Sequence, residues 1–423
     1  MSWELQHLDL RGGASPVADG AAPVHVVWWW DALPVGSGAY LSSELPLADD
    51  QLRDLAARFA AEQLATRLPA LGGVPAAASD GRPLIESALD AARGFDDFAA
   101  LDTLAAPAQA DASALAVIVC TRDRPQALAS CLAALSAQRR PPGEILVVDN
   151  SREGSARVVA EAHPGVRWLH EPRPGLSVAR NAGLRACTRP LVAFTDDDTR
   201  AHPNWTAELA DTFERHPEAD AVTGLVLPAA LDTEAERFFQ FDMGGFGSRH
   251  VPVRFDRRFF FATLSLVPKV WHIGAGANMA FRRAVFGRVG GFDERLGAGA
   301  AGCSEDSELW YRILAGDGVC LYEPRAVVDH HHRADWRSLR TQMRAYMRGH
   351  VAALLIQHAR FGHRGNLRRA LWQLPRYFLD TALDLPFQRT RRPRGVVLWE
   401  QLRGWASGLA CALRPGGRRA RSY

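Results

Sequence analysis

Five short apolar segments, separated by helix-like stretches, limit what this 423-residue chain can fold into more than any other feature. Alternation of buried strands with helices is typical of βαβ units, whose right-handed crossovers build a parallel sheet covered by helices. The sequence therefore predicts an α/β fold for the middle of the chain, with strands at 115–120, 144–149, 166–171, 191–196 and 221–226.

Polar residues follow three of these segments at the point where each strand should end. Thr121 to Arg124 follow the first segment, Asp149 ends the second, and Asp196 to Asp198 close the fourth. Carboxyl ends of parallel strands meet at one edge of a sheet, and open α/β folds bind their ligands at that edge. We therefore expect these side chains to surround one binding site.

The consecutive acids Asp196, Asp197 and Asp198 are the strongest candidate for a metal site. Carboxylates this close repel one another, and a divalent cation relieves the repulsion. Mg²⁺ or Mn²⁺ held by one or two carboxylates completes its shell with water and substrate phosphates. A solvated turn that caps the helix near Trp205 is the alternative, because Asp also favours turns and N-caps.

Changes in composition along the chain predict three units. The first is an α+β accessory unit with a strand at 24–30 and a helix at 49–68, joined by a linker near 105–113. The tryptophans at 28–30 indicate either a sugar-stacking platform or core residues with one exposed ring. The predicted boundaries are 1–112 for the accessory unit, 113–335 for a catalytic domain, and 336–423 for a helical, basic extension.

The basic extension carries an excess of positive charge. Residues 360–423 hold fourteen arginines against Asp380, Asp384 and Glu400, although the whole chain has a net charge of only +3. No nucleic-acid-binding motif accompanies these arginines. Interspersed aromatic residues fit an anionic membrane surface or a lipid diphosphate acceptor better.

The six cysteines are scattered, which favours neither a zinc site nor a disulfide scaffold. The N-terminus lacks the pattern of a signal peptide, and no apolar stretch has the length of a membrane span. We expect a cytoplasmic protein that can also lie at the inner face of the membrane as a peripheral protein.

Seven segments in order resemble family 2 glycosyltransferases with the GT-A fold, over about residues 113–335. The fold implied is a mostly parallel sheet flanked by helices. The segments are CTRDRP (120–125), EILVVDNS (144–151), GLSVARNAGL (175–184), FTDDD (194–198), GAGANMAFRR (274–283), GGFDE (290–294) and SEDSELWYRI (304–313).

The resemblance implies a nucleoside diphosphate sugar donor and Mn²⁺ or Mg²⁺ as cofactor. A carboxylate accepts hydrogen bonds from a base or ribose, and an arginine neutralises diphosphate. Turn formation and surface ion pairing are the alternatives for Asp149 and Arg180. The residues implied in nucleotide-sugar binding are Thr121, Arg124, Asp149, Arg180, Asp196 and Asp197, and those implied in metal binding are Asp198 and His330.

For His330 the alternative is a solvent-facing histidine, and its neighbours His331 and His332 leave the choice of ligand open. Gly276, Ala277 and Asn278 match the segment that lies against the donor sugar, where small residues let the backbone approach the ligand. A tight turn before a strand is the alternative for these three residues.

The pair Glu305 and Asp306 matches the acids that contact the acceptor and act as general base. Asp306 is the predicted base and Glu305 the orienting or acceptor-binding residue. Stabilisation of a helix N-terminus behind Ser304 is the alternative. The sequence 297–302 satisfies a dinucleotide-binding pattern literally, but no strand precedes it, and we interpret it as an acceptor-side loop.

The predicted function is transfer of a sugar, of hexosyl type, with inversion from a nucleoside diphosphate to a hydroxyl acceptor, which is a glycan, a lipid-linked molecule or a small molecule. One rival is a nucleotidyltransferase, which usually has a glycine-rich loop after the first strand; here CTRDRP has no glycine. A second rival is a catalytically silent scaffold that binds sugar nucleotides or glycans, which an intact pair of acids at 305–306 disfavours.

Overall fold

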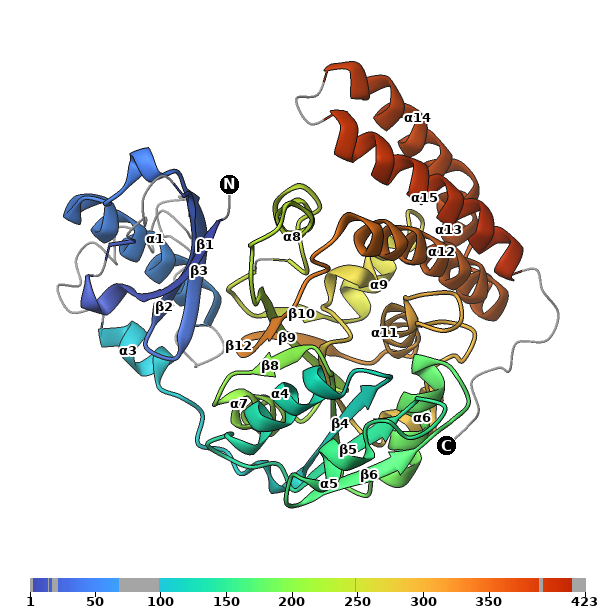
Figure 1. Cartoon of the computed structure of the whole chain (residues 1–423), viewed down its shortest axis with the longest axis horizontal. Helices are drawn as coiled ribbons and strands as arrows, with labels where there is room; N and C mark the ends of the chain where they lie inside the picture. Colours follow the sequence, from blue (N-terminus) through green and yellow to red (C-terminus); the bar gives the residue numbers. More distant parts are fainter. Residues whose placement is uncertain are drawn as a thin grey trace.

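A computed structural model describes residues 3–13, 15–16, 22–67, 99–247, 249–387 and 391–412. Its central feature is a nine-stranded mixed sheet in the order β10-β12-β9-β11-β7-β4-β5-β6, with β8 paired to β12 (Figure 1). The strands are β4 (Leu115–Thr121), β5 (Glu144–Asp149), β6 (Val166–His170), β7 (Leu191–Asp196), β8 (Thr199–Ala201), β9 (Ala221–Pro228), β10 (Val253–Phe255), β11 (Asn278–Arg282) and β12 (Cys320–His330).

All five apolar segments form strands of this sheet, which confirms the predicted α/β fold. Strands β7, β4, β5 and β6 are parallel neighbours, and β9 runs parallel to β12. Strand β11 lies antiparallel between β7 and β9. The parallel register aligns Cys120 with Asp196 and Thr121 with Asp149, so the polar strand ends reach the same edge.

Helices cover both faces of the sheet because the strands are apolar on both sides. One face of β4, with Ile118, packs in a cluster with α6 (Leu176–Ala186) and α11 (Glu305–Ala315). The other face, with Val117 and Val119, packs with α4 (Pro125–Ser136) and α7 (Trp205–Arg215). This packing fixes the N-termini of α6 and α11 beside the polar strand ends.

A separate three-stranded sheet forms the N-terminal part of the described chain, with β1 parallel and β3 antiparallel to β2. Trp28 is fully buried, and Trp30 donates to Asp102 at 2.8 Å. Trp29 stacks on His202 with ring centroids 5.3 Å apart. The tryptophans therefore serve packing rather than a sugar platform. The elements are β1 (Glu4–Asp9), β2 (Val24–Trp30), β3 (Leu33–Tyr40), α1 (Asp49–Arg67) and α3 (Ala99–Ala105).

The N-terminal sheet packs directly on the large sheet, because Val27 shares a buried cluster with Leu225, Leu227 and Val327 from β9 and β12. A buried ion pair adds to this interface: Arg67 at the end of α1 donates to both carboxylate oxygens of Glu323, at 3.0 and 3.3 Å.

The C-terminal part is helical, as predicted. Helix α15 packs along α12, and both lie beside the cleft side of the large sheet (Figure 1). Residues 413–423 of the predicted extension lie outside the described residues. The helices are α12 (Trp336–Phe361), α13 (Arg364–Arg368), the π-helix η7 (Arg369–Gln373), α14 (Leu374–Asp384) and α15 (Arg391–Ala412).

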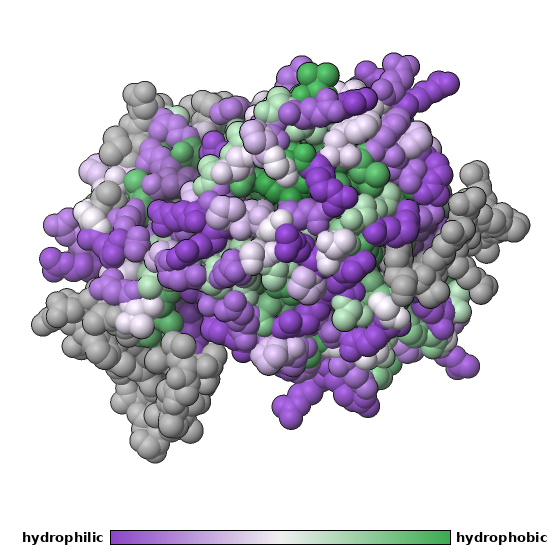
Figure 2. All heavy atoms as spheres, turned by 90° about the horizontal axis from the view of Figure 1, so that it is seen from below, coloured by the Kyte–Doolittle hydropathy of each residue, from purple (hydrophilic) through white to green (hydrophobic). Residues whose placement is uncertain are grey.

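None of the helices in the described part of the chain combines the length and apolar character that a membrane crossing requires. The face seen in Figure 2 is covered mainly by hydrophilic side chains, with smaller hydrophobic areas between them. The large apolar side chains with high exposure include several on η7 and α14, namely Leu371, Trp372, Tyr377, Leu379 and Leu383.

Candidate functional site

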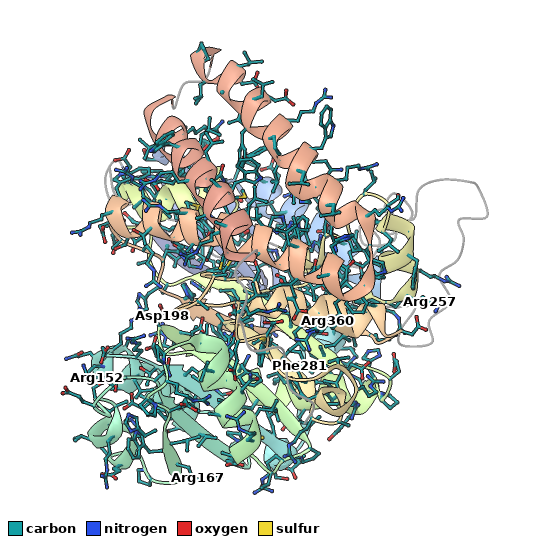
Figure 3. All side chains as sticks on the ribbon, turned by 90° about the vertical axis from the view of Figure 1, so that its right-hand side faces the viewer. Arg152, Arg167, Asp198, Arg257, Phe281 and Arg360 are labelled. Atoms are coloured by element: carbon teal, nitrogen blue, oxygen red, sulfur yellow. The ribbon has the colours of Figure 1, made fainter. Side chains whose placement is uncertain are left out.

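A cleft of about 1480 Å³ lies where β4 and β7 end, between the sheet and the C-terminal helices. The triple acid at 196–198 and the pair Glu305 and Asp306 both line it. Figure 3 shows Asp198 between the sheet, marked by Arg152 and Arg167, and the helices above it. Two motifs more than a hundred residues apart in the sequence thus share one cavity.

Asp196, Asp198 and His330 bring one ligand atom each to within 4.8 Å of one another. The short strand β8 explains how: it follows the acids directly and pairs with β12, which aligns Thr199 with His330. The amide of His331 also donates to the carbonyl of Asp198 at 3.1 Å. The local chain path therefore fixes the acids against the end of β12.

These three residues have the chemistry of a divalent metal site. Burial lowers the pKa of His330, which keeps its imidazole in the neutral form that binds metals, and its Nδ1 has no hydrogen-bond partner among the described residues. Burial raises the pKa of Asp198, but His330, Arg124 and Arg333 lower it by more, so the pKa of this carboxyl lies below its usual value. Because His330 is itself neutral near pH 7, we attribute that lowering to the two arginines. Carboxylate and imidazole ligands fit Mn²⁺ well, and carboxylates fit Mg²⁺.

Asp197 points away from the metal-site atoms toward the loop after β4. Its carboxylate accepts from the Thr121 hydroxyl at 2.7 Å and from Arg124 at 2.6 Å. Burial raises the pKa of Asp197 to about 6, although Arg124 and Thr121 oppose the shift. Arg124 also donates to Asp198 at 2.8 Å. Thr121, Arg124 and Asp197 thus form one network at the rim of the cleft.

Arg180 connects the two acidic motifs. From inside α6, its buried guanidinium donates to Glu305 at 2.6 Å, to Asp196 at 3.2 Å and to the carbonyl of Gly276 at 3.1 Å. A guanidinium presents several donors in a fixed plane and can hold three acceptors at once. The alternative of a surface ion pair does not describe it, because Arg180 is only 2% exposed.

Asp306 lies at the start of α11, next to Glu305. Its Oδ1 accepts from the amide of Ser307 at 2.6 Å, and burial raises the pKa of Asp306 while Arg180 and Ser307 oppose the shift. A Cβ atom at Gly276 would lie 3.1 Å from both Asp306 Oδ2 and Arg180 Nη2. Ser304 precedes the helix with φ of 69° and makes no side-chain cap. A positive φ there lets the chain enter α11 with both acids at the cleft.

The structure does not bring two of the predicted residues into the cleft. The buried carboxylate of Asp149 accepts from the amides of Ser151 and Ala156, at 3.0 and 2.7 Å, and closes the turn after β5. This geometry favours the turn alternative, and the nucleotide-binding role of Asp149 stays a prediction. Asn150, the next residue, lines the cleft instead.

Asn278 also has a structural role. Its fully buried amide donates to the carbonyls of Leu225 and Ala326, at 2.9 and 2.8 Å, and its oxygen accepts from Trp205. It ties β11 to β9 and to the irregular pairing of β12 near Ala326, and it does not line the cleft. Gly276 and Ala277 do line the cleft, as does the loop 298–302 in part.

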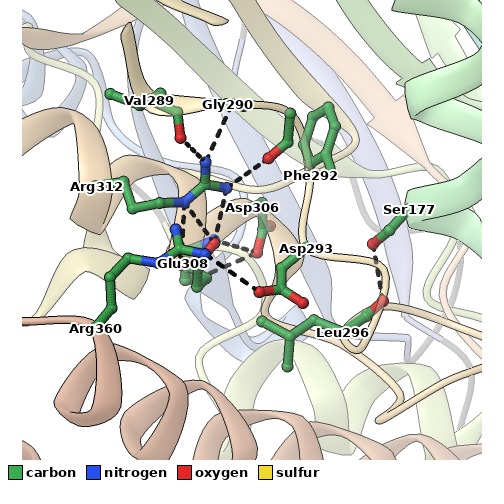
Figure 4. Close-up of polar contacts among 12 residues, drawn as sticks. Ser177, Val289, Gly290, Phe292, Asp293, Leu296, Asp306, Glu308, Arg312 and Arg360 are labelled. Carbon is green, nitrogen blue, oxygen red and sulfur yellow. Dashed lines mark hydrogen bonds and ion pairs between the residues drawn. The ribbon is translucent and has the colours of Figure 1, made fainter. Parts of the chain in front are cut away.

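A second network, not anticipated from the sequence, positions the acidic pair. Buried Glu308 accepts from Arg312, one turn along α11, and Arg360 of α12 lies 3.3 Å from Glu308 (Figure 4). Arg312 also donates to the carbonyls of Val289, Gly290 and Gly291, which anchors the segment leading to Phe292. The only sequence signal was an i, i+4 Glu–Arg pair, which is common on exposed helices.

A second unanticipated contribution comes from the segment after η5 (Phe238–Asp242). Phe246 packs edge-on against His330, with ring centroids 4.8 Å apart, and contacts His332 at 5.7 Å. Residues 243–247 line the cleft. This aromatic segment therefore covers the histidine side of the site. Its sequence has no regular spacing, so the contact between Phe246 and His330 could not be predicted from it.

Comparison with known proteins identifies the class. Residues 116–290 match the family model described as Glycosyl transferase family 2. This segment belongs to that family, and the prediction that the chain carries a family 2 glycosyltransferase domain is confirmed.

Two curated relatives share the domain. A glucosyl-dolichyl phosphate glucuronosyltransferase of Haloferax volcanii is 31% identical over 189 residues, 43% of this chain and 57% of that protein. A pre-mycofactocin glycosyltransferase of Mycobacterium tuberculosis is 30% identical over 226 residues, 51% of this chain and 43% of that protein. The chain thus spans about half the length of these relatives.

A solved structure of a mannosyltransferase from Pyrobaculum calidifontis, in complex with GDP-Man and Mn²⁺, aligns with 20% sequence identity and a TM-score of 0.47. The alignment covers 74% of this chain and 93% of that one. Similarity at this level carries no inference about the activity of the present chain.

Proposed function

We propose that the protein is a metal-dependent, inverting glycosyltransferase that moves a sugar from a nucleoside diphosphate to a hydroxyl acceptor. The observation that carries the proposal is the position of Arg180, which donates to Asp196 on one side and to Glu305 on the other. It joins a set of metal-type ligands to a pair of buried acids across one cleft.

On the donor side, we propose that Asp198, Asp196 and His330 hold Mn²⁺ or Mg²⁺. A divalent ion there would neutralise the negative charge that develops on a departing diphosphate. Thr121 and Arg124 lie at the same rim and would contact the nucleotide, and Asn150 is a further lining residue. Arg180 adds a fixed positive charge close to Asp196.

On the acceptor side, we propose Asp306 as general base. The acceptor oxygen would attack the anomeric carbon, its proton would pass to the Asp306 carboxylate, and the bond to the diphosphate would break with its electron pair. Attack opposite the leaving group inverts the anomeric centre. Glu305 is held by Arg180 and would orient the acceptor, and Gly276 and Ala277 would let the sugar approach the backbone.

We also propose that the chain comprises three units, 1–112, 113–335 and 336–423, of which the first braces the catalytic domain. The buried pair of Arg67 with Glu323 and the cluster around Val27 support this role.

A peripheral contact with anionic membranes is a further part of the proposal. Helix α14 and the preceding η7 expose Leu371, Trp372, Leu379 and Leu383, and Trp372 is 66% exposed. Arg368 and Arg376 lie along the same segment. An apolar face with flanking arginines is typical of helices that lie in an anionic bilayer interface.

The test of the main proposal uses purified protein, a panel of nucleoside diphosphate sugars and a mass-spectrometric measurement of donor turnover with and without Mn²⁺. We expect metal-dependent release of a nucleoside diphosphate from at least one donor. A protein that binds donors, with metal-dependent thermal stabilisation, yet never turns one over would instead be a binding scaffold.

A further inference from the structure

The cleft continues past the acidic pair into a region lined by cationic and aromatic side chains. Trp271, His272, His350 and Arg369 line this part, together with Arg249 from the segment before β10. The acids that line the cleft are Asp196, Asp197, Asp198, Glu305, Asp306 and Asp335, and Asp335 caps helix α12. Arginines pair with several of these acids, whereas no acid belongs to the lining group around Trp271.

Arg369 is the central residue of this region. It begins η7, its Nε donates to His350 at 3.1 Å, and its guanidinium lies 4.7 Å from the ring of Trp271. Within the described residues, no carboxylate lies within ion-pair distance of Arg369, and its two Nη atoms donate to no protein atom. A partly buried guanidinium without a counter-ion loses hydration, which one hydrogen bond and the contact with Trp271 replace only in part.

Arg249 shares this lack of a counter-ion. Its guanidinium lies 3.5 Å from the carbonyl of His272 and over the ring of Phe255, and no described carboxylate pairs with it. Burial and the nearby cations Arg249, Lys269 and Arg369 lower the pKa of His272, which indicates that all three charges lie around this residue. The wall opposite the acids thus concentrates positive charge.

The aromatic residues hold this arrangement in place. Trp271 packs edge-on against His350, with ring centroids 4.9 Å apart. Burial lowers the pKa of His350 to about 3, with Arg369 adding to the shift, so the imidazole is neutral and accepts the hydrogen bond from Arg369. The two Nη atoms of Arg369, which donate to no described protein atom, therefore face the cleft.

We propose that Arg369 and Arg249 form an anion subsite that binds a phosphate group of the acceptor. The inference rests on the proposed function and names its acceptor class: a hydroxyl compound that carries a phosphate monoester or diphosphate. Planar guanidinium groups bind phosphate oxygens in pairs, and two such groups suit a dianion better than a single carboxylate.

The position of this subsite fits an acceptor rather than the donor. The segment from Trp271 to Gly276 runs along the cleft, and five residues span at most about 18 Å. An acceptor whose phosphate lies on Arg369 would thus place a hydroxyl group near Asp306 when the two groups are separated by no more than the length of this segment. The phosphate is bound and is not itself transferred.

The experiment measures phosphate binding under conditions in which the donor site holds no metal. In EDTA, no divalent metal is present to hold a phosphate at the acids of the donor side. Titrations of tryptophan fluorescence, which includes Trp271, would use glycerol phosphate, a short-chain isoprenyl phosphate and the corresponding uncharged isoprenyl alcohol. The variants are Arg369→Gln and Arg249→Gln, and the matched control is Arg364→Gln, an exposed residue outside the cleft.

We expect wild type and Arg364→Gln to bind at least one phosphate, and both other variants to bind it about tenfold or more weakly, the loss expected for a charge-assisted hydrogen bond. Arg249→Gln keeps the test valid if Arg369→Gln does not fold, because Arg249 is exposed. Preference between the two phosphates distinguishes a lipid from a soluble acceptor.

Equal binding by wild type and both variants, or binding of the alcohol as tightly as its phosphate, would overturn the subsite. So would the absence of phosphate binding by the wild type. Metal-dependent hydrolysis of the donor by Arg369→Gln at the wild-type rate distinguishes the two hypotheses: the proposed function then stands, whatever the outcome of the titrations.

Discussion

Arg180 donates a 2.6 Å hydrogen bond to Glu305, and both side chains are almost completely buried. A buried ion pair contributes little net stability, but its rupture leaves an uncompensated charge. The pair is therefore better understood as a device that fixes the start of α11 relative to the end of β7. The separation of the two acidic motifs across the cleft depends on this contact.

Loss of a metal-type ligand is the most direct prediction. Asp198→Ala should lower kcat by about a thousandfold or more, because the charge on the leaving diphosphate then lacks its main stabilisation. The melting temperature should stay within a few degrees of wild type. Asp232→Ala is the matched control, since Asp232 is exposed and outside the cleft. Normal metal-independent turnover by Asp198→Ala would contradict the proposed mechanism.

A single methyl group at Gly276 should disturb the cleft without unfolding the protein. The Cβ atom would lie 3.1 Å from Asp306 Oδ2 and from Arg180 Nη2, closer than ordinary contact. We expect Gly276→Ala to lower kcat by about ten- to a hundredfold, the range that a small misplacement of reacting groups costs. Gly12→Ala, where no atom lies within 4 Å of the new Cβ, should leave steady-state kinetics unchanged.

The pH dependence of turnover follows from Asp306. Burial raises the pKa of this carboxyl, and a general base must be ionised, so kcat/KM should rise with pH through a range above the usual titration of aspartate. An acid limb at the ordinary position of an exposed aspartate would argue against Asp306 as the base.

The same shift has a consequence for stability. A carboxyl whose pKa is raised by folding stabilises the fold fully below its unfolded pKa, and this contribution is lost as pH rises through the folded pKa. Asp306→Asn cannot ionise. Its melting temperature should therefore increase relative to wild type as pH is raised from 4 to 8, and a difference that is constant across this range would refute the prediction.

The brace between the N-terminal unit and the large sheet can be tested by stability. Arg67→Met removes the partner of buried Glu323, and loss of one member of a buried pair typically costs about 3–5 kcal/mol. Urea unfolding should show a loss near the lower end, because Arg325 lies 3.4 Å from the same carboxylate. Arg53→Met, on the exposed side of α1, is the control and should be near neutral.

Vesicle binding tests the exposed side of α14. Trp372→Ser combined with Leu379→Ser should reduce sedimentation with vesicles of phosphatidylcholine and phosphatidylserine by about tenfold or more, because two large apolar side chains no longer enter the interface. Binding should also weaken with added salt. The control is the double variant Leu41→Ser and Val158→Ser, at exposed apolar residues elsewhere. Equal sedimentation of all three proteins would exclude this surface.

Much of the fold follows from local sequence pattern. The strand that ends at Asp196 and the helix that begins at Glu305 were predictable because apolar runs and helical spacing are local properties. The antiparallel position of β11 between β7 and β9 depends on contacts distant in sequence, and it carries no local signal.

The same difference between local and long-range contacts decides which site residues could be predicted. Asp198 and Asp306 were predicted from motifs, and the structure brings both into one cleft. The motif could not show that the amide of Asn278 lies beneath an irregular part of β12, or that Asp149 is saturated by the amides of its own turn. Arg369 lies in a helical extension without a motif, and only tertiary packing gives it a role.

Gln63 of α1 donates at 2.6 Å to the carbonyl of His250, in the segment whose earlier residues line the cleft. Exchange of the first hundred residues between relatives would therefore also replace Gln63, which supports the segment that lines the cleft. A functional chimaera would have to carry the aromatic segment and Glu323 together with the N-terminal unit, because these parts form one interface.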